Sequence, residues 1–391
     1  MPLTVLVNAG PWLPVPPSSY GGVENMLSYL IPELRRLGHS VVLSTVRDSR
    51  ITVDRYNYSF EEGQLRHIAA PYSDAIGIAH THMQDVIETI RTTPEIDVVH
   101  DVLEVVGPSM LATLGPDAPP VLHTLQWDLA GHSRFYRRFN GGNQVFFNGI
   151  SGPQMQRAPE NVRQQSLGVV HNGIDVSDFD FRKDKDDYFI TLARFAHDKG
   201  QDIAARICSE LGHRLQMAGT VGGIESPDHL SKELEDPSSP FHGYKDVAYY
   251  LGSVRVHEND KITWLGGVGG DQKRRLIARA RAMLMPIRWE EPFGMAVIEA
   301  LASGTPVVAM RRGAMPVIIE HGVNGFLADN EREFAYYLDR VSAIEPLECR
   351  RSVERNFSAT TMAQGYAELY QRTIERARKR LPFSPRPQRF G

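Results

Sequence analysis

Short apolar runs alternate with longer stretches in which apolar residues recur every three or four positions. Continuous apolar runs are typical of buried parallel strands, and a spacing of three to four is typical of helices. We expect strands at 3–7, 41–46, 66–70, 96–100, 121–125, 145–150, 188–193, 214–219, 262–265, 282–287 and 306–309. Alternation of strands and helices predicts mostly parallel, doubly wound sheets with ligands at the carboxyl ends of the strands.

A charged segment interrupts this alternation at residues 175–187, which read DVSDFDFRKDKDD and lack apolar periodicity. A chain of 391 residues suits two domains. We therefore predict a first domain over residues 1–170 and a second over 171–357. Residues 358–391 should form a helix followed by a basic tail.

Residues 285–310 (MPIRWEEPFGMAVIEALASGTPVVAM) hold the densest cluster of candidate chemistry. Pro292 is expected to open a helix over about 293–303, and Gly304 to end it. Amides at the start of this helix would favour an anion. Glu299 would lie on a face of small residues, where a ligand can come close. An ordinary solvated glutamate explains the same pattern.

Two further pairs of residues suggest phosphate binding. Gly21 and Gly22 lie where the first strand passes into a helix, so backbone could approach a phosphate there. A flexible turn is the alternative. Arg194 follows a strand and Lys199 precedes the next helix, and together they could bring two cations to one diphosphate. A solvated charge pair is again the alternative.

Glu291 and Glu299, with seven residues between them and Gly304-x-Pro306-Val-Val-Ala after them, resemble the E-x7-E signature of retaining glycosyltransferase family 4. The resemblance is dense over residues 166–327 and sparser at 3–38 and 96–128. It implies the GT-B fold, with two Rossmann-like domains and a nucleotide sugar bound in the interdomain cleft. It also implies that the last helix crosses back onto the first domain.

The resemblance assigns roles to individual residues. Arg194 and Lys199 would bind the donor diphosphate, Glu291 the transferred sugar and Glu299 the ribose hydroxyls. The remaining donor-binding residues implied are Gly21 and Gly22 at the diphosphate, Val268 at the nucleobase, and Phe293, Gly294 and Met295 at the start of the central helix.

The chain departs from the family pattern at two positions. Family members carry a histidine two residues after Thr124, where this chain has Gln126. The nearest histidine is His123, three residues earlier, and an odd offset on a strand points to the opposite face. We keep His123 and Gln126 as candidate catalytic residues without choosing between them. Val317 occupies a position where a glutamate is common.

Two basic segments could contact an acceptor or an anionic membrane surface. Residues 131–147 (GHSRFYRRFNGGNQVFF) combine arginines with aromatic residues, but a solvated loop is the favoured interpretation. The end of the last helix carries Arg372, Arg376, Arg378, Lys379 and Arg380. A solvated tail is favoured there, with a weak membrane contact as the alternative.

Composition restricts the function further. The net charge of -4 gives no electrostatic case for nucleic acid as a partner. No stretch reaches the ~20 apolar residues that span a bilayer, and the first residues do not form a signal peptide. Cys208 and Cys349 fit neither a zinc site nor a disulfide framework. We expect a cytoplasmic protein with no metal and no cofactor.

The sequence therefore predicts a metal-independent retaining glycosyltransferase that moves a sugar from a nucleoside-diphosphate sugar, carrying UDP or GDP, to an acceptor hydroxyl. Two alternatives stay open. A GT-B phosphorylase or nucleotide-sugar epimerase would share the scaffold. A non-catalytic nucleotide-sugar-binding protein would share the donor site. The acceptor and the oligomeric state are not predicted.

Overall fold

The computed structural model describes residues 1–17, 21–68 and 72–379, and the chain divides into two compact units. Unit 1 comprises Met1–Pro17, Gly21–His171 and the chain from Ala359 onward. Unit 2 comprises Asn172–Ser358. Unit 1 is therefore built from both ends of the chain.

Unit 1 contains a seven-stranded parallel sheet in the order β3-β2-β1-β4-β5-β6-β7. Residues Val7 and His100 are register partners on β1 and β4, the pair of strands at which the strand order reverses. The strands are β1 Thr4–Asn8, β2 Ser40–Thr45, β3 Arg55–Tyr58, β4 Val98–Asp101, β5 Val121–Leu125, β6 Val145–Gly149 and β7 Ser166–Val169.

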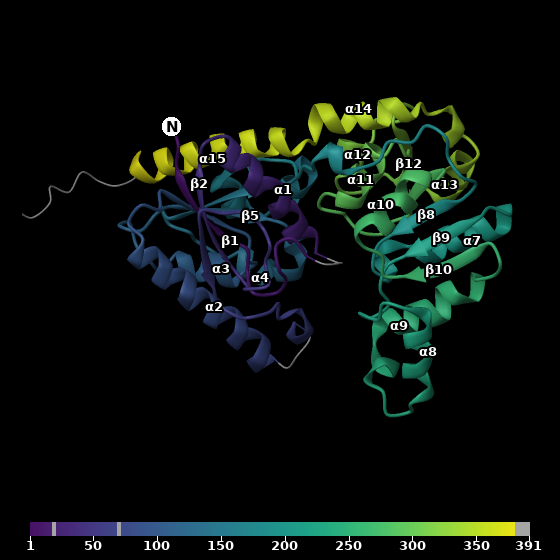
Figure 1. Cartoon of the computed structure of the whole chain (residues 1–391), viewed down its shortest axis with the longest axis horizontal. Coiled ribbons are helices and arrows are strands. Elements are labelled where there is room, and N and C mark those ends of the chain that lie inside the picture. Colours follow the sequence, from purple (N-terminus) through teal and green to yellow (C-terminus); the bar gives the residue numbers. More distant parts are fainter. Residues whose placement is uncertain (18–20, 69–71, 380–391) are drawn as a thin grey trace, which may run out of the picture. The chain divides into compact units, whose positions relative to one another are not determined.

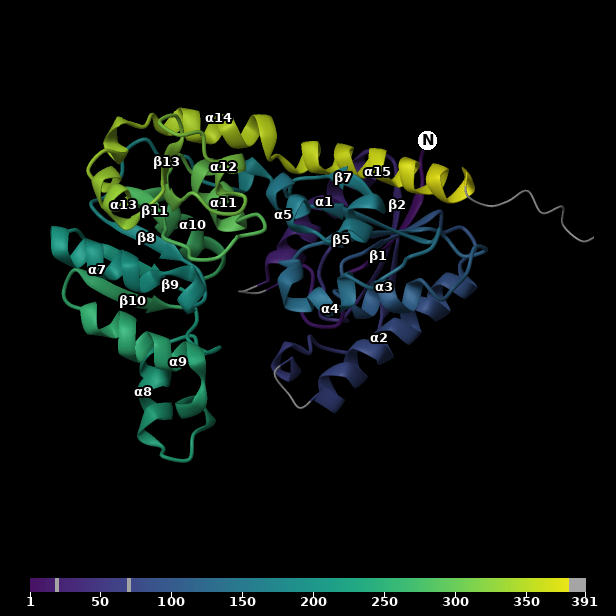
Figure 2. The same ribbon diagram turned by 180° about the vertical axis from the view of Figure 1, so that it is seen from behind.

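Helices cover both faces of this sheet. Figures 1 and 2 show α1 and α15 on one side and α2, α3 and α4 on the other. The α-helices of unit 1 are α1 Gly22–Arg36, α2 Tyr72–Thr92, α3 Val106–Leu111, α4 Ser133–Tyr136, α5 Gly152–Arg157, α6 Glu160–Gln164 and α15 Ala359–Lys379. The short 3₁₀ helices are η1 Leu65–His67 and η2 Leu129–His132.

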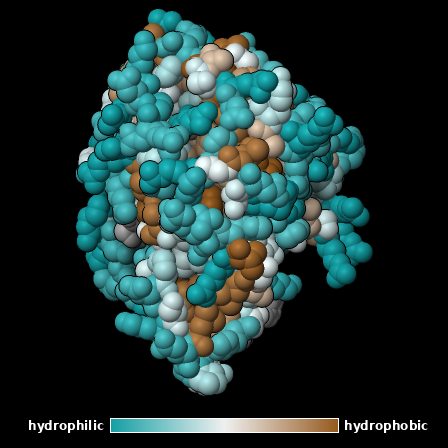
Figure 3. Space-filling model, turned by 90° about the vertical axis from the view of Figure 1, so that its right-hand side faces the viewer, coloured by the Kyte–Doolittle hydropathy of each residue, from teal (hydrophilic) through white to brown (hydrophobic). Residues whose placement is uncertain are grey.

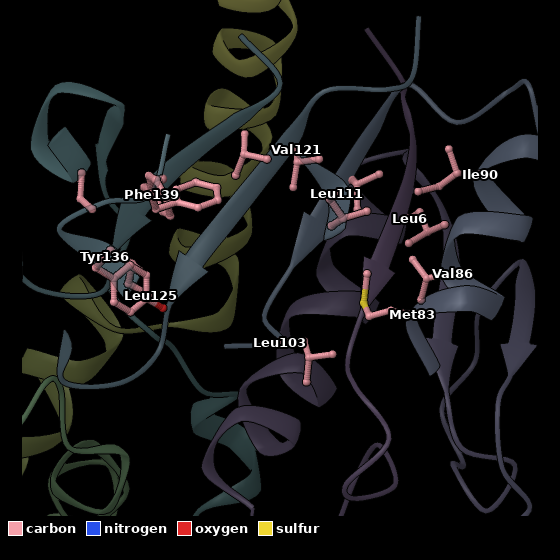
Figure 4. Close-up of a cluster of buried hydrophobic side chains, with 14 of the residues drawn as sticks. Leu6, Met83, Val86, Ile90, Leu103, Leu111, Val121, Leu125, Tyr136 and Phe139 are labelled. Carbon is pink, nitrogen blue, oxygen red and sulfur yellow. The ribbon is translucent and has the colours of Figure 1, made fainter. Parts of the chain in front are cut away.

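One large apolar cluster joins the sheet of unit 1 to the helices α2 to α6 (Figure 4). Leu6, Val99 and Val121 contribute from the strands, and Met83 and Leu111 from the helices. Successive side chains of a strand point to opposite faces, so each of these strands also sends side chains toward α1 and α15. Both faces of the sheet are therefore buried, as its continuous apolar strands predict.

Unit 2 contains a six-stranded parallel sheet in the order β10-β9-β8-β11-β12-β13. Its strands follow the same chain order as the first six of unit 1, with the reversal between β8 and β11. The strands are β8 Phe189–Leu192, β9 Leu215–Ala218, β10 Ile262–Gly266, β11 Ala282–Met285, β12 Val307–Met310 and β13 Gly325–Ala328.

The helices of unit 2 include the central helix α11, which connects β11 to β12 and contacts both α10 and α14. The α-helices are α7 Gln201–Leu211, α8 Pro227–Glu235, α9 Lys245–Tyr249, α10 Gly270–Arg279, α11 Met295–Ala302, α12 Met315–Ile318, α13 Glu331–Leu338 and α14 Pro346–Asn356. A π-helical turn spans Tyr250–Val254, and 3₁₀ turns span Val176–Asp178, His197–Lys199, Pro240–Gly243, Arg255–His257 and Val341–Ala343.

The two parallel sheets confirm the predicted fold class, but two local predictions are wrong. A strand was expected at 66–70, but Leu65–His67 form a 3₁₀ turn and residues 69–70 lie outside the described part of the chain. The third strand of the chain is instead β3, most of whose side chains are half-buried. Pro292 does not open the central helix, because Gly294 at φ 109° precedes its first residue, Met295.

Candidate active site

The candidate site of unit 2 lies where β8 and β11 end side by side, at the reversal of strand order. Arg194 follows β8, and Glu290 and Glu291 follow β11. The segment before α7 packs tightly on the end of β11, because a Cβ atom on Gly200 (φ 74°) would lie 2.0 Å from the carbonyl oxygen of Pro286. Only glycine fits this approach. The crevice beside such a reversal is where open parallel sheets bind ligands.

A bidentate ion pair anchors the segment after β11 to α7. Arg288 donates from Nη1 and Nη2 to the two carboxylate oxygens of Asp202, at 2.8 and 2.6 Å. Tyr249 also donates to Asp202, at 2.6 Å. Burial raises the pKa of Asp202, but the hydrogen bonds from Arg288 and Tyr249 outweigh it and hold that pKa below its ordinary value. The carboxylates that follow in the sequence are thus presented from a fixed segment.

Glu291 is held through one of its two oxygens. Lys199 Nζ lies 2.7 Å from Glu291 Oε2, and Trp289 Nε1 donates to the same atom at 3.1 Å. Both side chains of the ion pair are mostly buried, at 17% and 13% exposure. Glu291 Oε1 has no hydrogen-bond partner among the described residues. A ligand hydroxyl could therefore bind Oε1 without displacing Lys199.

Glu299 repeats this arrangement on the central helix. It is 4% exposed, and Lys273 on α10 lies 2.8 Å from Glu299 Oε1. No described residue donates a hydrogen bond to Glu299 Oε2. A buried carboxylate needs a partner of opposite charge, and Lys273 supplies it. The interpretation of Glu299 as an ordinary solvated residue is therefore wrong.

Arg194 is paired with a residue of the segment between β9 and β10. Its Nη1 lies 3.1 Å from Asp246 Oδ2, with side-chain exposures of 43% and 33%. Gln201 Nε2 donates to the backbone oxygen of Arg194 at 2.8 Å and fixes the main chain there. The guanidinium group of Arg194 is accessible to solvent, but it is already paired with the carboxylate of Asp246. Arg194 and Lys199 thus have different carboxylate partners in this structure.

The start of α11 offers backbone amides, as the sequence predicts. Amides in the first turn of a helix have no acceptor within the helix.

Phe293 is buried against Phe357, with ring centroids 5.8 Å apart, so its side chain belongs to the core. Glu290 accepts a hydrogen bond from the amide of Gly313 at 2.7 Å and holds the segment after β12 against the carboxylate segment. Val317 on α12 is half-buried.

The remaining donor candidates lie on glycine-containing segments. Val268 is half-buried after β10. Gly21 (φ 150°) precedes the first residue of α1, Gly22. Ser18, Ser19 and Tyr20 of the same loop lie outside the described residues. Glu24 in the first turn of α1 is buried, and desolvation raises its pKa to about 7.

His123 belongs to a buried polar chain in unit 1. Its Nδ1 lies 2.6 Å from Asp101 Oδ2, and both side chains have 0% exposure. Asn8 donates to Asp101 Oδ1 at 2.7 Å and binds His82 at 2.6 Å. Burial lowers the pKa of His82 to about 3, so this histidine is neutral. His123 Nε2 has no partner among the described residues. The complete burial of His123 favours a structural role over contact with an acceptor.

Gln126 follows β5 directly and is half-buried, at the carboxyl end of its strand. Thr124 lies on the opposite face of β5 from His123. Its hydroxyl and the His100 ring share a hydrogen bond of 2.8 Å, and the other ring nitrogen of His100 shares one of 2.8 Å with the hydroxyl of Tyr370 on α15. Of the two candidate catalytic residues in unit 1, Gln126 is therefore the more accessible.

The aromatic residues of the segment 131–147 are largely core. Tyr136 and Phe139 are buried and pack on Phe147, while Arg134, Arg137 and Arg138 are exposed. The predicted solvated loop is therefore wrong for the aromatic residues and correct for the arginines.

At the end of α15, Arg372, Arg376 and Lys379 line a shallow surface hollow with Leu167 and Glu375. Arg380 and the tail lie outside the described residues.

No helix in the described part of the chain combines the length and the apolar character needed to cross a bilayer. Figure 3 shows a largely hydrophilic face with an apolar patch low in the view. Exposed large apolar side chains of unit 2 include Leu211 at 46% and Val256 at 67%.

Three residues of the site were not predicted from the sequence: Lys273, Trp289 and Asp246. Trp289 adjoins the carboxylate pair in the sequence, so proximity alone could have suggested it. Lys273 and Asp246 carry no comparable signal, because their partners lie 26 and 52 positions away.

Comparison with known proteins supports the GT-B interpretation. Residues 175–357 match the family model for glycosyl transferases group 1. An uncharacterized glycosyltransferase of Methanocaldococcus jannaschii is 29% identical over 199 residues, 46% of this chain and 46% of its own length. The D-inositol 3-phosphate glycosyltransferase of Mycolicibacterium smegmatis is 26% identical over 251 residues, 59% of this chain and 53% of its own length. The chain spans about half the length of the curated relatives it matches.

Solved structures match over both units. A glycosyltransferase of avilamycin A biosynthesis has a TM-score of 0.61 at 22% identity, covering 96% of this chain and 98% of its own. Sucrose-phosphate synthase of Thermosynechococcus elongatus has a TM-score of 0.72 at 14% identity, covering 95% and 99%. Anabaena HepE, solved with UDP and glucose, has a TM-score of 0.63 at 16% identity, covering 95% and 100%. The predicted GT-B fold is confirmed.

Proposed function

We propose that this GT-B protein, whose second unit matches group 1 glycosyl transferases, is a retaining hexosyltransferase. It moves a sugar from a nucleoside-diphosphate sugar to an acceptor hydroxyl. The family match over residues 175–357 and the names of the curated relatives support a glycosyltransferase. Retention, independence of metal ions and the residue roles below are parts of this proposal.

One observation carries the proposal: each glutamate of the central segment has one oxygen bound to a lysine and the other without a described partner. Glu291 Oε2 is bound by Lys199, and Glu299 Oε1 by Lys273. A carboxylate oxygen accepts strong, charge-assisted hydrogen bonds from hydroxyl groups. One of these oxygens belongs to Glu299 on α11 and the other to Glu291 on the segment before α11. This arrangement suits a ligand that carries hydroxyl groups on two separate rings. We assign Glu291 to the transferred sugar and Glu299 to the ribose.

The chemical requirement is to stabilise a leaving group that gains negative charge as the glycosidic bond breaks. Arg194, Lys199 and the first amides of α11, near Gly294 and Met295, would supply fixed positive charge for this purpose. Arg194 must then exchange Asp246 for a phosphate oxygen. The acceptor would attack from the face from which the diphosphate leaves, and a phosphate oxygen would take its proton. This route retains the configuration without a protein nucleophile.

UDP or GDP is the proposed nucleotide. Anabaena HepE, which shares the fold, has been solved with UDP-glucose, so UDP-glucose is a reasonable first donor to test. The acceptor is a small molecule, a glycan or a lipid-linked sugar. We place the protein in the cytoplasm and propose at most a weak contact of the basic end of α15 with an anionic membrane surface.

The test is a screen of UDP- and GDP-sugars by thermal shift, followed by turnover assays with the donor that stabilises the protein. A panel of sugar and lipid-linked acceptors would be added, and the anomeric configuration of the product read by NMR. We expect nucleotide release that depends on acceptor and a product with the anomeric configuration of the donor.

The assay also separates the alternatives. Cleavage that requires inorganic phosphate would indicate a phosphorylase, and conversion of the donor without acceptor would indicate an epimerase. Donor binding with neither transfer nor slow hydrolysis would indicate a binding protein. An inverted product would overturn the retaining mechanism.

A further inference from the structure

A buried glutamine on α5 binds the main chain at the carboxyl end of β5. The side chain of Gln154 is 2% exposed, and its Nε2 donates to the backbone oxygens of Leu125 and Trp127 at 2.7 and 2.8 Å. Its Oε1 accepts from the amide of Ile150 at 2.9 Å. Carbonyl oxygens only accept and a backbone amide only donates, so these three partners determine the orientation of the side-chain amide. Both N–H donors of Gln154 are therefore used on the residues that flank Gln126.

These hydrogen bonds begin where the sheet stops holding β5. The ladder between β5 and β6 ends at the pair Leu125 and Gly149, and the ladder between β4 and β5 ends earlier, at His123. In the described part of the chain, no strand pairs with the residues after Leu125. Gln154 is itself fixed, because its amide donates to Ser151 Oγ at the start of α5 at 3.3 Å. The side chain of Gln154 thus continues the attachment of β5 beyond the end of the sheet.

A second buried glutamine makes the same kind of contact before β5, the strand whose end residues Val121 and Leu125 are labelled in Figure 4. Gln144 is 6% exposed, and its Nε2 donates to the backbone oxygens of Ala118 and Pro119 at 3.3 and 2.6 Å. One glutamine comes before β6 and the other after it. Ligands of parallel sheets bind at the carboxyl ends of the strands. The two glutamines therefore share their chemistry, but only the one on α5 lies at a functional end of β5.

We propose that Gln154 is a positioning residue for acceptor use, which holds the main chain on both sides of Gln126 and so fixes where the Gln126 side chain meets the acceptor. Gln154 is buried and acts through Gln126 without touching substrate. This inference rests on the proposed function, because it assumes that an acceptor binds at the carboxyl end of β5. Misplacement of a reacting group by about 1 Å can cost about 100-fold in rate. The charged residues assigned to the donor belong to unit 2, so donor binding should not depend on Gln154.

The test compares Gln154→Met with Gln144→Met in the full chain. Each substitution removes two hydrogen bonds to carbonyl oxygens and keeps a buried side chain of similar volume, so both should lower the melting temperature by a similar amount. The donor is the sugar nucleotide chosen by the thermal-shift screen, and the acceptor is the one found in the panel above. Gln154→Met should lower kcat/KM for the acceptor by about ten- to 100-fold, whereas Gln144→Met should stay within about three-fold of wild type. Calorimetric affinity for UDP or GDP should change little in both variants.

A double-mutant cycle separates positioning from general damage. If Gln154 acts through Gln126, then Gln154→Met should cost less than about three-fold in kcat/KM when Gln126→Ala is already present. Hydrogen exchange provides a measurement that needs no substrate. The backbone amides of residues 126–131 should exchange about ten-fold faster in Gln154→Met and at the wild-type rate in Gln144→Met.

Three results would overturn the positioning role. Equal losses of kcat/KM in Gln154→Met and Gln144→Met would show a purely structural side chain. Fully additive losses in the cycle with Gln126→Ala would show that Gln154 does not act through Gln126. Unchanged exchange of residues 126–131 in Gln154→Met would show that the main chain is held by other contacts. If Gln154→Met does not fold, Gln154→Glu takes its place, because it keeps the shape and the acceptor for the amide of Ile150.

The outcome for the proposed function is separate. A wild type that transfers sugar to an acceptor, with Gln154→Met as active as Gln144→Met, refutes only the positioning role. A wild type that transfers sugar to no acceptor of the panel refutes the proposed function, and the positioning role falls with it.

Discussion

The ammonium group of Lys199 lies 4.3 Å from the centroid of the Trp289 indole ring. Trp289 also donates to the carboxylate oxygen that Lys199 binds, so the three side chains of Lys199, Trp289 and Glu291 form one unit. A cation over an indole face is attracted by the ring, and this attraction restrains an otherwise mobile side chain. Lys199 is thus positioned before any ligand arrives.

Lys199→Ala and Arg194→Ala should each reduce donor use. Loss of a charge-assisted contact to the leaving group should cost about 2–4 kcal/mol, or roughly 30- to 1000-fold in kcat/KM. Lys199→Ala should have the larger effect, because it also leaves Glu291 without its counter-ion. Steady-state kinetics with the identified donor measures both. Arg206→Ala on the surface of α7 is the control, and turnover within a few-fold of wild type for both test variants would place the diphosphate elsewhere.

The two glutamates should separate by binding. Glu299→Ala should weaken free nucleoside diphosphate and intact donor alike, by about 1.5–3 kcal/mol for hydrogen bonds to a charged group. Glu291→Ala should leave diphosphate binding almost unchanged but lower turnover and reduce selectivity for the sugar. Calorimetry on both variants measures this, with the exposed Glu320→Ala as control. The opposite pattern would reverse the assignment of the two residues.

Asp246→Asn should strengthen diphosphate binding. In the structure Asp246 occupies the guanidinium of Arg194, and its negative charge would lie close to a bound diphosphate. Removing that charge from a partly exposed pair should raise affinity by about three- to ten-fold, with the larger effect at low salt. Titration of UDP or GDP at two salt concentrations measures it. A weaker affinity would mean that Asp246 orients Arg194 for the ligand.

Transfer should continue after removal of divalent cations. Arg194, Lys199 and the helix amides would provide the positive charge that a metal ion supplies elsewhere. Turnover after treatment with EDTA should therefore match the untreated rate. Activity lost in EDTA and restored by Mn²⁺ or Mg²⁺ would contradict the proposed chemistry.

Glu24 should make unit 1 less stable as the pH rises. Burial raises its pKa to about 7 from an ordinary value of 4.5, so the folded state binds the proton more tightly. The cost is absent below pH 4.5, grows between pH 4.5 and 7, and reaches about 3 kcal/mol above that range. Glu24→Gln should therefore raise the melting temperature relative to wild type at pH 8 and have little effect at pH 5.

Glu33→Gln on the same helix provides a control of opposite sign. The hydrogen bond from Arg36 lowers the pKa of Glu33, so its contribution is present at neutral pH and lost on acidification. This variant should lower the melting temperature at pH 8 more than at low pH. Equal responses of the two variants to pH would show that burial does not control the ionisation of Glu24.

The sheets were predictable because their strands are continuous apolar runs, as in β11 and β12. The prediction of a strand at 66–70 was wrong because a short run of Ile68 and two alanines resembles a strand. The real third strand, β3, was missed because it is mostly half-buried and contains no apolar run. Pro292 was a reasonable helix start, but the positive φ of Gly294 sets the boundary two residues later. Local signals therefore located the elements better than their ends.

The site was predictable only in part. The E-x7-E spacing singled out Glu291 and Glu299, and strand ends singled out Arg194 and Lys199. The pairing of these residues depends on which distant side chains the fold brings near, as with Lys273 and Asp246. His123 shows the same limit, because its burial beside Asp101 follows from strand register and not from its own neighbours in the sequence.

The helix α15 has a consequence for the order in which the protein can fold during synthesis. Tyr366 and Tyr370 of this helix are fully buried in unit 1, and Tyr370 binds His100 of β4, 270 residues earlier. Unit 2 is continuous in sequence and can complete its core as soon as Ser358 has left the ribosome. Unit 1 is translated first, but the face of its sheet that α1 covers stays incomplete until α15 emerges. The half of the protein that is made first is therefore the half that is finished last.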